Sequence, residues 1–320
     1  MNLSYRELSE KAYNLHTNKQ LDLAEKIYVS LLKTKPDDVN ILNLYGLLLI
    51  SKGDYKKAIT YLTRAMIIKK SAYVISNLAK AYHLNNEPDK AIKLYNQALS
   101  FGQNDDIYYS LAIAHKALGN KEEVIKNYKK AVELNPDNFK ALYNLALAYK
   151  NDNDSDNAIM YAEMAIKVNE NDEDTHALLS KCYEEREYYS QAIKELEKAA
   201  ALNPGNYVYY YNLGVLYTKI NDVTKAEENY KKSLLLNEAH IETYVNLASL
   251  YRKNSKEMCL AYLLKAYKLK PDEPNVCLGL AQIYRDMYDN EKSIKILNEL
   301  LLKNDKIADI YAQMAMNYMD

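Results

Sequence analysis

Histidine and cysteine are the side chains of this sequence best suited to metal binding and nucleophilic chemistry. The five histidines (His16, His83, His115, His176 and His240) include no pair four residues apart and no HExxH motif, which a zinc protease would need. The three cysteines (Cys182, Cys259 and Cys277) form no CxxC pair and suggest neither a disulfide framework nor a zinc site. We therefore expect the cysteines to be small buried residues and expect no metal site.

Glycine-rich and acidic segments give no sign of a phosphate or calcium site either. The 7 glycines are dispersed and form no GxGxxG, GxxxxGK[ST] or GxSxG motif. The acidic runs at 151–157 and 169–174 lack the central glycine and terminal glutamate of an EF-hand loop, and they fall where turns between helices are expected. The sequence thus predicts no catalytic residues and no cofactor, and the chain is predicted not to be an enzyme.

The composition favours a helical structure built from one repeated environment. The chain has 320 residues, with 42 Lys+Arg, 43 Asp+Glu and a formal net charge of −1. This near-zero charge removes bulk electrostatic attraction to nucleic acid or to an anionic membrane, so neither is expected as a partner. The low numbers of turn-forming residues, 7 Gly and 6 Pro, argue against an all-β fold. The 32 Tyr, beside 2 Phe and no Trp, indicate that one packing site recurs.

The sequence shows no targeting or membrane-spanning signal. Arg6, Glu7, Glu10 and Lys11 lie within a helical pattern at the N-terminus, and no apolar core of a signal peptide follows them. No window approaches the roughly 18 uncharged apolar residues of a membrane span. Together with the cysteine content, these features predict a cytoplasmic location.

Two short phrases recur along the whole chain. The first is NLAKAY at 77–82, NLALAY at 144–149, NLGVLY at 212–217 and NLASLY at 246–251. A second phrase follows each, such as KAIKLYNQAL at 90–99, and then a stop such as LNPDN at 134–138. Small residues of the second phrase recur at intervals of 33 or 34: Ala24, Ala58, Ala91, Val124, Ala158, Ala192, Ala226, Cys259 and Ser293. Such a period is typical of a repeat protein.

The recurring phrases resemble the tetratricopeptide repeat (TPR) family, whose unit is a helix–turn–helix of about 34 residues. Counting positions within the unit, small residues stand at position 8: Ala12, Gly46, Ala79, Ala112, Ala146, Ser180, Gly214, Ala248 and Ala281. Position 11 is usually Tyr, as in Tyr82, Tyr149, Tyr183, Tyr217, Tyr251 and Tyr284. The resemblance implies an all-α fold, a right-handed superhelical α-solenoid of helix–turn–helix repeats, with first helices lining its concave face.

The resemblance divides the chain into nine full repeats and one terminal helix. The expected TPR array spans 5–307, with repeats at 5–38, 39–71, 72–104, 105–138, 139–172, 173–206, 207–240, 241–273 and 274–307, and 308–320 as a terminal helix or the start of a tenth repeat. Within a unit, the small residue at position 8 should face the one at position 20 and let the two helices approach closely.

Turn and cap residues are expected at fixed places in the unit. Position 15 should take a positive φ, which Gly53, Gly119, Asn86, Asn153 and Asn221 tolerate well. Asp37, Asp137 and Asp272 each follow a proline, and we expect them to cap the next first helix.

Family resemblance also assigns positions 2, 5, 6, 9, 12 and 13 to a partner-binding groove. Position 6 is Asn77, Asn144, Asn212 and Asn246, whose amides could pair with both backbone groups of an extended peptide. This row is similar to the asparagine ladder in the repeats of O-linked N-acetylglucosamine transferase. Position 5 supplies Tyr109, Tyr143 and Tyr211, and position 9 supplies Ile113, Leu147 and Val215, as apolar walls. The alternative is that these residues only pack against neighbouring helices.

Three functions remain open on the sequence. The first is a non-catalytic protein–protein interaction scaffold that binds a peptide or helix of another protein in the groove. The second is the substrate-recruiting TPR portion of a larger enzyme, such as a glycosyltransferase similar to O-linked N-acetylglucosamine transferase. The third is a self-associating structural array, with contacts through the apolar residues of 308–319.

Overall fold

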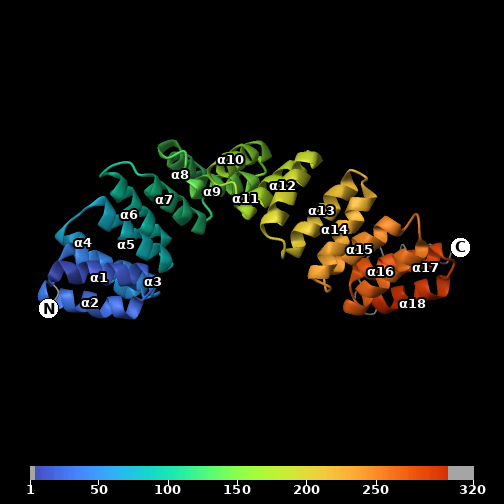
Figure 1. Cartoon of the computed structure of the whole chain (residues 1–320), viewed down its shortest axis with the longest axis horizontal. Coiled ribbons are helices and arrows are strands. Elements are labelled where there is room, and N and C mark those ends of the chain that lie inside the picture. Colours follow the sequence, from blue (N-terminus) through green and yellow to red (C-terminus); the bar gives the residue numbers. More distant parts are fainter. Residues whose placement is uncertain (1–3, 302–320) are drawn as a thin grey trace. The chain divides into compact units, whose positions relative to one another are not determined.

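The structure is a computed structural model that describes residues 4–301 (Figure 1). Every regular element in that range is a helix, and the range contains no strand. The all-α helical repeat fold expected from the sequence is therefore confirmed. The chain divides into two compact units, residues 1–170 and 171–320, and each is described by itself. The expected terminal helix at 308–320 and the end of the ninth repeat lie outside the described residues.

The first unit consists of five consecutive helix pairs. They are α1 (Tyr5–Thr17) with α2 (Leu21–Thr34), α3 (Val39–Ser51) with α4 (Tyr55–Ile68), α5 (Ala72–Leu84) with α6 (Pro88–Leu99), α7 (Asp105–Ala117) with α8 (Lys121–Leu134), and α9 (Phe139–Asn151) with α10 (Ser155–Val168). Each first helix packs on its own second helix and on the second helix of the preceding pair, as α3 does on α4 and α2.

The second unit repeats the same arrangement in its described part. The pairs are α11 (Glu173–Glu185) with α12 (Tyr189–Leu202), α13 (Tyr207–Lys219) with α14 (Val223–Leu236), α15 (Ile241–Tyr251) with α16 (Lys256–Leu269), and α17 (Pro274–Asp286) with α18 (Asn290–Leu301). One pair cannot cover both of its apolar faces, so adjacent pairs must stack to complete the core.

Small residues at positions 8 and 20 lie in the core of a helix pair. Ala12 and Ala24, at positions 8 and 20 of the first pair, are both fully buried. Position 24 lies one turn beyond position 20, and its side chain covers position 8. At Gly214 an added Cβ would lie 2.5 Å from the ring of Tyr230, so only glycine fits this crossing without movement.

A residue in the left-handed region turns the chain between the helices of most pairs. The expected residues Gly53, Asn86, Gly119, Asn153 and Asn221 have φ of 79°, 61°, 74°, 59° and 59°, which confirms the prediction. Lys19, Glu187 and Tyr288 take the same conformation at position 15, with φ of 61°, 60° and 62°. These three turns were not evident from residue type, because the side chains of Lys, Glu and Tyr disfavour this region.

The α15–α16 pair departs from this turn. Helix α16 starts at residue 256, which is 15 residues after the start of α15 at residue 241. In the first pair, α2 starts at residue 21, which is 16 residues after the start of α1 at residue 5. Helix α15 ends early, and Ser255 caps α16 from an extended conformation by accepting the Met258 N–H. The 33-residue spacing at this repeat therefore arises within the pair, at its turn.

The predicted caps after proline are wrong by one residue at Asp37 and Asp137. Asp38, not Asp37, accepts the N–H groups of Asn40 and Ile41 at the start of α3. Asn138 takes the same role for Ala141. Proline opens a two-residue turn, so the cap falls on the second residue after it. Before α17 the corresponding residue, Glu273, makes no side-chain cap, and neither does Asp272.

Candidate binding pockets along the first helices

All ten residues assigned to the groove lie on first helices. Asn77 is on α5, Tyr109 and Ile113 on α7, Tyr143, Asn144 and Leu147 on α9, Tyr211, Asn212 and Val215 on α13, and Asn246 on α15. Nine of them are partly buried, whereas Asn212 is exposed. The residues are therefore divided between the two units, and each unit offers its own candidate surface.

The four position-6 asparagines differ in what their amides contact. Asn77 Nδ2 donates to Asn43 Oδ1 of the preceding repeat at 2.8 Å. Asn246 Nδ2 donates to the Tyr211 hydroxyl at 3.3 Å, and Asn144 Nδ2 donates to the Lys140 carbonyl at 2.9 Å. The exposed Asn212 forms no side-chain hydrogen bond to the described residues. Three of the amides thus already have a donor engaged within the chain.

Position 6 also lies beside position 24 of the preceding repeat. Burial raises the pKa of Tyr95, at position 24, to about 12, and a hydrogen bond from Ser110, at position 6 of the next repeat, opposes the shift. The pKa of Tyr230 is raised by burial in the same way, with Thr218 and Asn246 as hydrogen-bonding neighbours. The buried tyrosine hydroxyls at position 24 therefore lie close to position 6 of the following repeat.

A pocket of about 520 Å³ lies between α5 and α7 in the first unit, and we call it the repeat 3–4 pocket. It brings together two of the predicted residues, Asn77 and Tyr109. Its other lining residues are Ala72, Tyr73, Ser76, Lys80, Tyr95, Asn104, Asp106, Ile107 and Ser110. The mixture of hydroxyl, amide and charged groups suits a peptide backbone with polar side chains.

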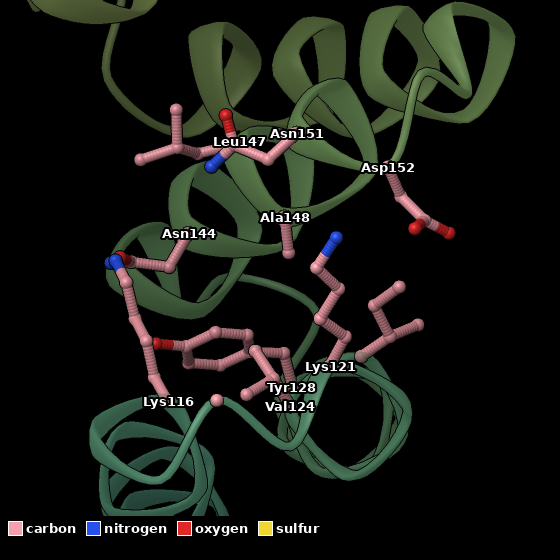
Figure 2. Close-up of a pocket in the computed structure, with 11 residues that line it drawn as sticks. Lys116, Lys121, Val124, Tyr128, Asn144, Leu147, Ala148, Asn151 and Asp152 are labelled. Carbon is pink, nitrogen blue, oxygen red and sulfur yellow. The ribbon is translucent and has the colours of Figure 1, made fainter.

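A second pocket of about 230 Å³ follows it in the same unit, and we call it the repeat 4–5 pocket (Figure 2). It includes the predicted residues Asn144 and Leu147. Its remaining lining residues are Lys116, Gly119, Lys121, Val124, Ile125, Tyr128, Ala148, Asn151 and Asp152. The rings of Tyr109 and Tyr128 lie 5.7 Å apart, so an aromatic contact joins the two pockets.

In the second unit, Tyr211 and Asn246 line a pocket of about 260 Å³. Burial raises the pKa of Tyr211, and its ring lies edge-on to His240 at 4.8 Å. Lys270 and Glu273, which also line this pocket, are paired with one another at 2.6 Å. The one lysine of this pocket is therefore already paired with a carboxylate, unlike Lys116 and Lys121 of the repeat 4–5 pocket.

Four of the predicted groove residues do not line these three pockets. They are Ile113, Tyr143, Asn212 and Val215. The ring of Tyr143 stacks on Phe139 of its own helix, with centroids 6.4 Å apart. Sequence reasoning missed Tyr128, Lys121 and Val124, which all lie on the second helix of the pair, α8. The recurrence of Tyr at position 24, in Tyr28, Tyr95, Tyr128 and Tyr230, was a signal that could have indicated them.

No group of three or more His, Cys, Asp or Glu among residues 4–301 could hold a metal ion. The three cysteines are buried, as expected for small residues of the core. His176 is buried, and its Nδ1 lies 2.6 Å from Glu195 Oε2. In the part of the chain that the structure describes, no helix is long and apolar enough to cross a membrane.

Models of the tetratricopeptide repeat match most of the chain. The TPR repeat model matches 116–153, and tetratricopeptide repeat models match 11–73, 49–116, 139–172, 174–206 and 195–228. Together these matches cover 11–172 and 174–228, which include repeats of both units.

Two curated proteins are similar over part of this array. Anaphase-promoting complex subunit CDC16 of Saccharomyces cerevisiae is 30% identical over 130 residues, covering 38% of this chain and 16% of that protein. Protein O-mannosyl-transferase TMTC3 of Homo sapiens is 30% identical over 129 residues, covering 40% of this chain and 12% of that protein. The chain thus corresponds to less than a fifth of the length of either relative.

Solved structures share the helical repeat fold. The C-terminal part of a TPR repeat-containing protein from Cytophaga hutchinsonii has a TM-score of 0.65 and 20% identity, covering 74% of this chain and 98% of that one. The pilF protein of Pseudomonas aeruginosa has a TM-score of 0.52 and 19% identity, covering 66% and 97%. From the sequence matches and the stacked helix pairs, the chain belongs to the tetratricopeptide repeat family.

Proposed function

We propose that this protein is a non-catalytic interaction scaffold that holds a peptide or helix of another protein against its first helices, with the main site in repeats 3 to 5. The observation that carries the proposal is the pair of neighbouring pockets joined by Tyr109 and Tyr128. Four of the residues assigned to the groove from sequence, Asn77, Tyr109, Asn144 and Leu147, line them.

The chemistry of this surface suits an extended chain. Asn77 and Asn144 each use one amide donor within the protein, and the oxygen of each amide is left to accept a peptide N–H. Tyr109 is partly buried and supplies contact area with few rotatable bonds, which lowers the entropy lost on binding. One relative is named as a subunit of the anaphase-promoting complex, and this fits an interaction role at the level of the family.

A pull-down with two matched multiple variants tests the proposal. The groove variant carries Asn77→Ala, Tyr109→Ala, Asn144→Ala and Leu147→Ala. The control carries Lys26→Ala, Lys56→Ala and Lys93→Ala, which are exposed residues on second helices. Both must retain the helical circular dichroism of the wild type. We expect the groove variant to lose prey proteins that the control keeps; identical prey sets for all three proteins would refute the proposal.

A role as the recruiting portion of a larger enzyme is the second candidate. It is favoured by the match to Protein O-mannosyl-transferase TMTC3, of which this chain covers 12%. A transcript that joins this array to a catalytic domain would support it, and a transcript that encodes the array alone would exclude it.

Self-association and location also remain proposals. The proposed contacts through 308–319 lie outside the described residues, and light scattering with and without 308–320 tests them. Cell fractionation with a tagged full-length protein tests the cytoplasmic location.

A further inference from the structure

The repeat 4–5 pocket contains a buried hydroxyl that has no hydrogen-bond partner within residues 4–301. Tyr128 is 1% exposed, and its Oη contacts no donor or acceptor among the described residues. In Figure 2 this hydroxyl points to the side of the pocket that holds Lys116 and Asn144. Burial raises the pKa of Tyr128, so the group stays protonated and is available as a donor. An unsatisfied buried hydroxyl is rare and costly, because it has lost water without gaining a partner.

Two lysines of the same pocket also lack a carboxylate partner. Lys116 and Lys121 form no ion pair with any described acidic group, whereas Lys126 and Lys130 nearby pair with Glu123 and Glu133 at 2.8 and 2.5 Å. The only acidic residue in the pocket lining is Asp152, which leaves the lining with an excess of positive charge. An anion entering this pocket would therefore meet attraction without first breaking an ion pair.

The start of α8 borders the pocket. Its N-cap residue, Asn120, makes no side-chain cap, and Gly119 and Lys121 on either side of it line the pocket. Glu122 and Glu123 in the first turn of α8 offset the positive end of the helix. The attraction for an anion therefore comes from the two lysines.

The walls of the pocket are apolar. Val124, Ile125, Leu147 and Ala148 surround the polar groups, and the volume of about 230 Å³ admits an amino-acid side chain. A ligand group that suits this pocket therefore needs a short apolar stem and a negatively charged, accepting end. A glutamate side chain has both features, and its two methylene groups let the carboxylate reach past the walls.

From this arrangement we infer that the repeat 4–5 pocket binds the side-chain carboxylate of a glutamate in the bound peptide, through the Tyr128 hydroxyl and the ammonium groups of Lys116 and Lys121. The inference rests on the proposed peptide-binding function and names the chemistry that this site selects. The rest of the peptide would lie along the repeat 3–4 pocket, which adjoins it through Tyr109. No covalent step is involved.

Defined peptide libraries test this selectivity. The probes are fluorescent nine-residue peptides, acetylated and amidated, with Glu, Gln, Asp or Lys fixed at the centre and the other places drawn from Ala, Ser, Thr, Val and Asn. Because the ends are blocked, a carboxylate can come only from the central residue. Binding to the full chain is measured by fluorescence anisotropy. We expect the Glu library to bind about tenfold more tightly than the Gln library, as a charge-assisted hydrogen bond provides, and Asp to bind less tightly than Glu.

Matched variants separate recognition from loss of stability. Tyr128→Phe and Lys116→Gln should remove most of the preference for Glu over Gln while leaving the Gln library bound as before. Tyr28 is the control for the hydroxyl, because it also occupies position 24 and is buried with an unpartnered Oη but does not line this pocket. Tyr28→Phe should keep the Glu preference, and so should Lys93→Gln, which removes an exposed charge on α6.

The outcomes distinguish this inference from the function on which it rests. If wild type binds the Glu and Gln libraries equally, or if Tyr128→Phe keeps the preference, glutamate selection is refuted while peptide binding stands. If the groove variant with four alanines binds every library as well as wild type does, the binding site lies elsewhere and both proposals fail. If no library binds at millimolar protein, both fail as well.

Discussion

Replacement of Gly214 by alanine tests how closely the helices of a pair must approach. Gly214 lies at position 8 of α13 and faces Tyr230 of α14. An ideal Cβ there would lie 2.5 Å from Tyr230 Cδ1 and Cε1 and 2.9 Å from Cγ. Carbon atoms pack most favourably at about 3.5–4.0 Å, so the ring would have to move by about 1 Å.

Tyr230 has little freedom to make that movement. It is 1% exposed, and its hydroxyl lies 3.3 Å from Thr218 Oγ1, which donates to the Gly214 carbonyl at 2.8 Å. Overpacking a tight core costs about 1–3 kcal/mol. Alanine gains about 1 kcal/mol over glycine in a helix. Because the contact involves several atoms of a rigid ring, we expect Gly214→Ala to lower the free energy of unfolding by about 1–2 kcal/mol.

Urea unfolding followed by circular dichroism measures this change, and hydrogen exchange should place the loss of protection in α13 and α14. Gly205→Ala is the control, because the nearest atom to its added Cβ would be Asn203 Oδ1 at 3.7 Å. In a Tyr230→Ala background the ring is absent, so the sign should reverse and Gly214→Ala should stabilise the protein. Equal or greater stability of Gly214→Ala with the ring present would refute the reasoning.

Three further predictions follow from other parts of the structure. Cys182, Cys259 and Cys277 are buried, and burial raises the pKa of Cys259, so a chromogenic thiol reagent should react with none of them in the native protein and with all three in urea. Lys52 lies 2.6 Å from both Asp22 and Glu25, and its hydrogen bonds hold the pKa of each carboxyl below the usual range. This stabilisation is present above the unfolded-state pKa of the carboxyls and is lost as the pH falls through their folded-state pKa. Lys52→Gln should therefore lower the urea midpoint at pH 7 but not at a pH where both carboxyls are protonated. An equal drop in the urea midpoint at the low pH would contradict this. Tyr288 is 93% exposed with φ of 62°, so Tyr288→Gly should stabilise the protein by about 0.5–1 kcal/mol in urea unfolding, because glycine adopts this conformation freely.

The sequence predicted those features of the fold that a single residue type controls. A small residue at position 8 lets the side chain at position 24 of the second helix pack directly over it, as the contact between Gly214 and Tyr230 shows. Asn and Gly at position 15 indicated the left-handed turns. The same turn formed at Lys19, Glu187 and Tyr288, where packing of the flanking helices overrides the preference of the residue.

Features set by two residues together were less predictable. Asp37 and Asp38 are both good cap residues, and only the length of the proline turn decides between them. Asp37 instead accepts from Arg64 Nη2 at 2.7 Å, a contact between residues far apart in sequence. The position-6 asparagines were predicted as a row of equivalent groups, but their hydrogen bonds depend on different neighbours: Asn43, Tyr211 or a carbonyl of the same helix.

The candidate site itself arises from such a pair. The Tyr230 hydroxyl lies 3.3 Å from Thr218 Oγ1 of its own repeat, and Ser110 and Asn246 of the following repeats are hydrogen-bonding neighbours of Tyr95 and Tyr230. Tyr128 has Asn144 at the equivalent place, but that amide donates to the Lys140 carbonyl, and the Tyr128 hydroxyl keeps no partner. Asn144 and Asn246 both occupy position 6, so a pattern of single positions assigns them the same role. Of the two, only beside Asn144 does the neighbouring tyrosine hydroxyl stay without a partner among the described residues. The partner of a position-24 hydroxyl thus depends on the whole junction between two repeats, and neither position 24 nor the next position 6 predicts it alone.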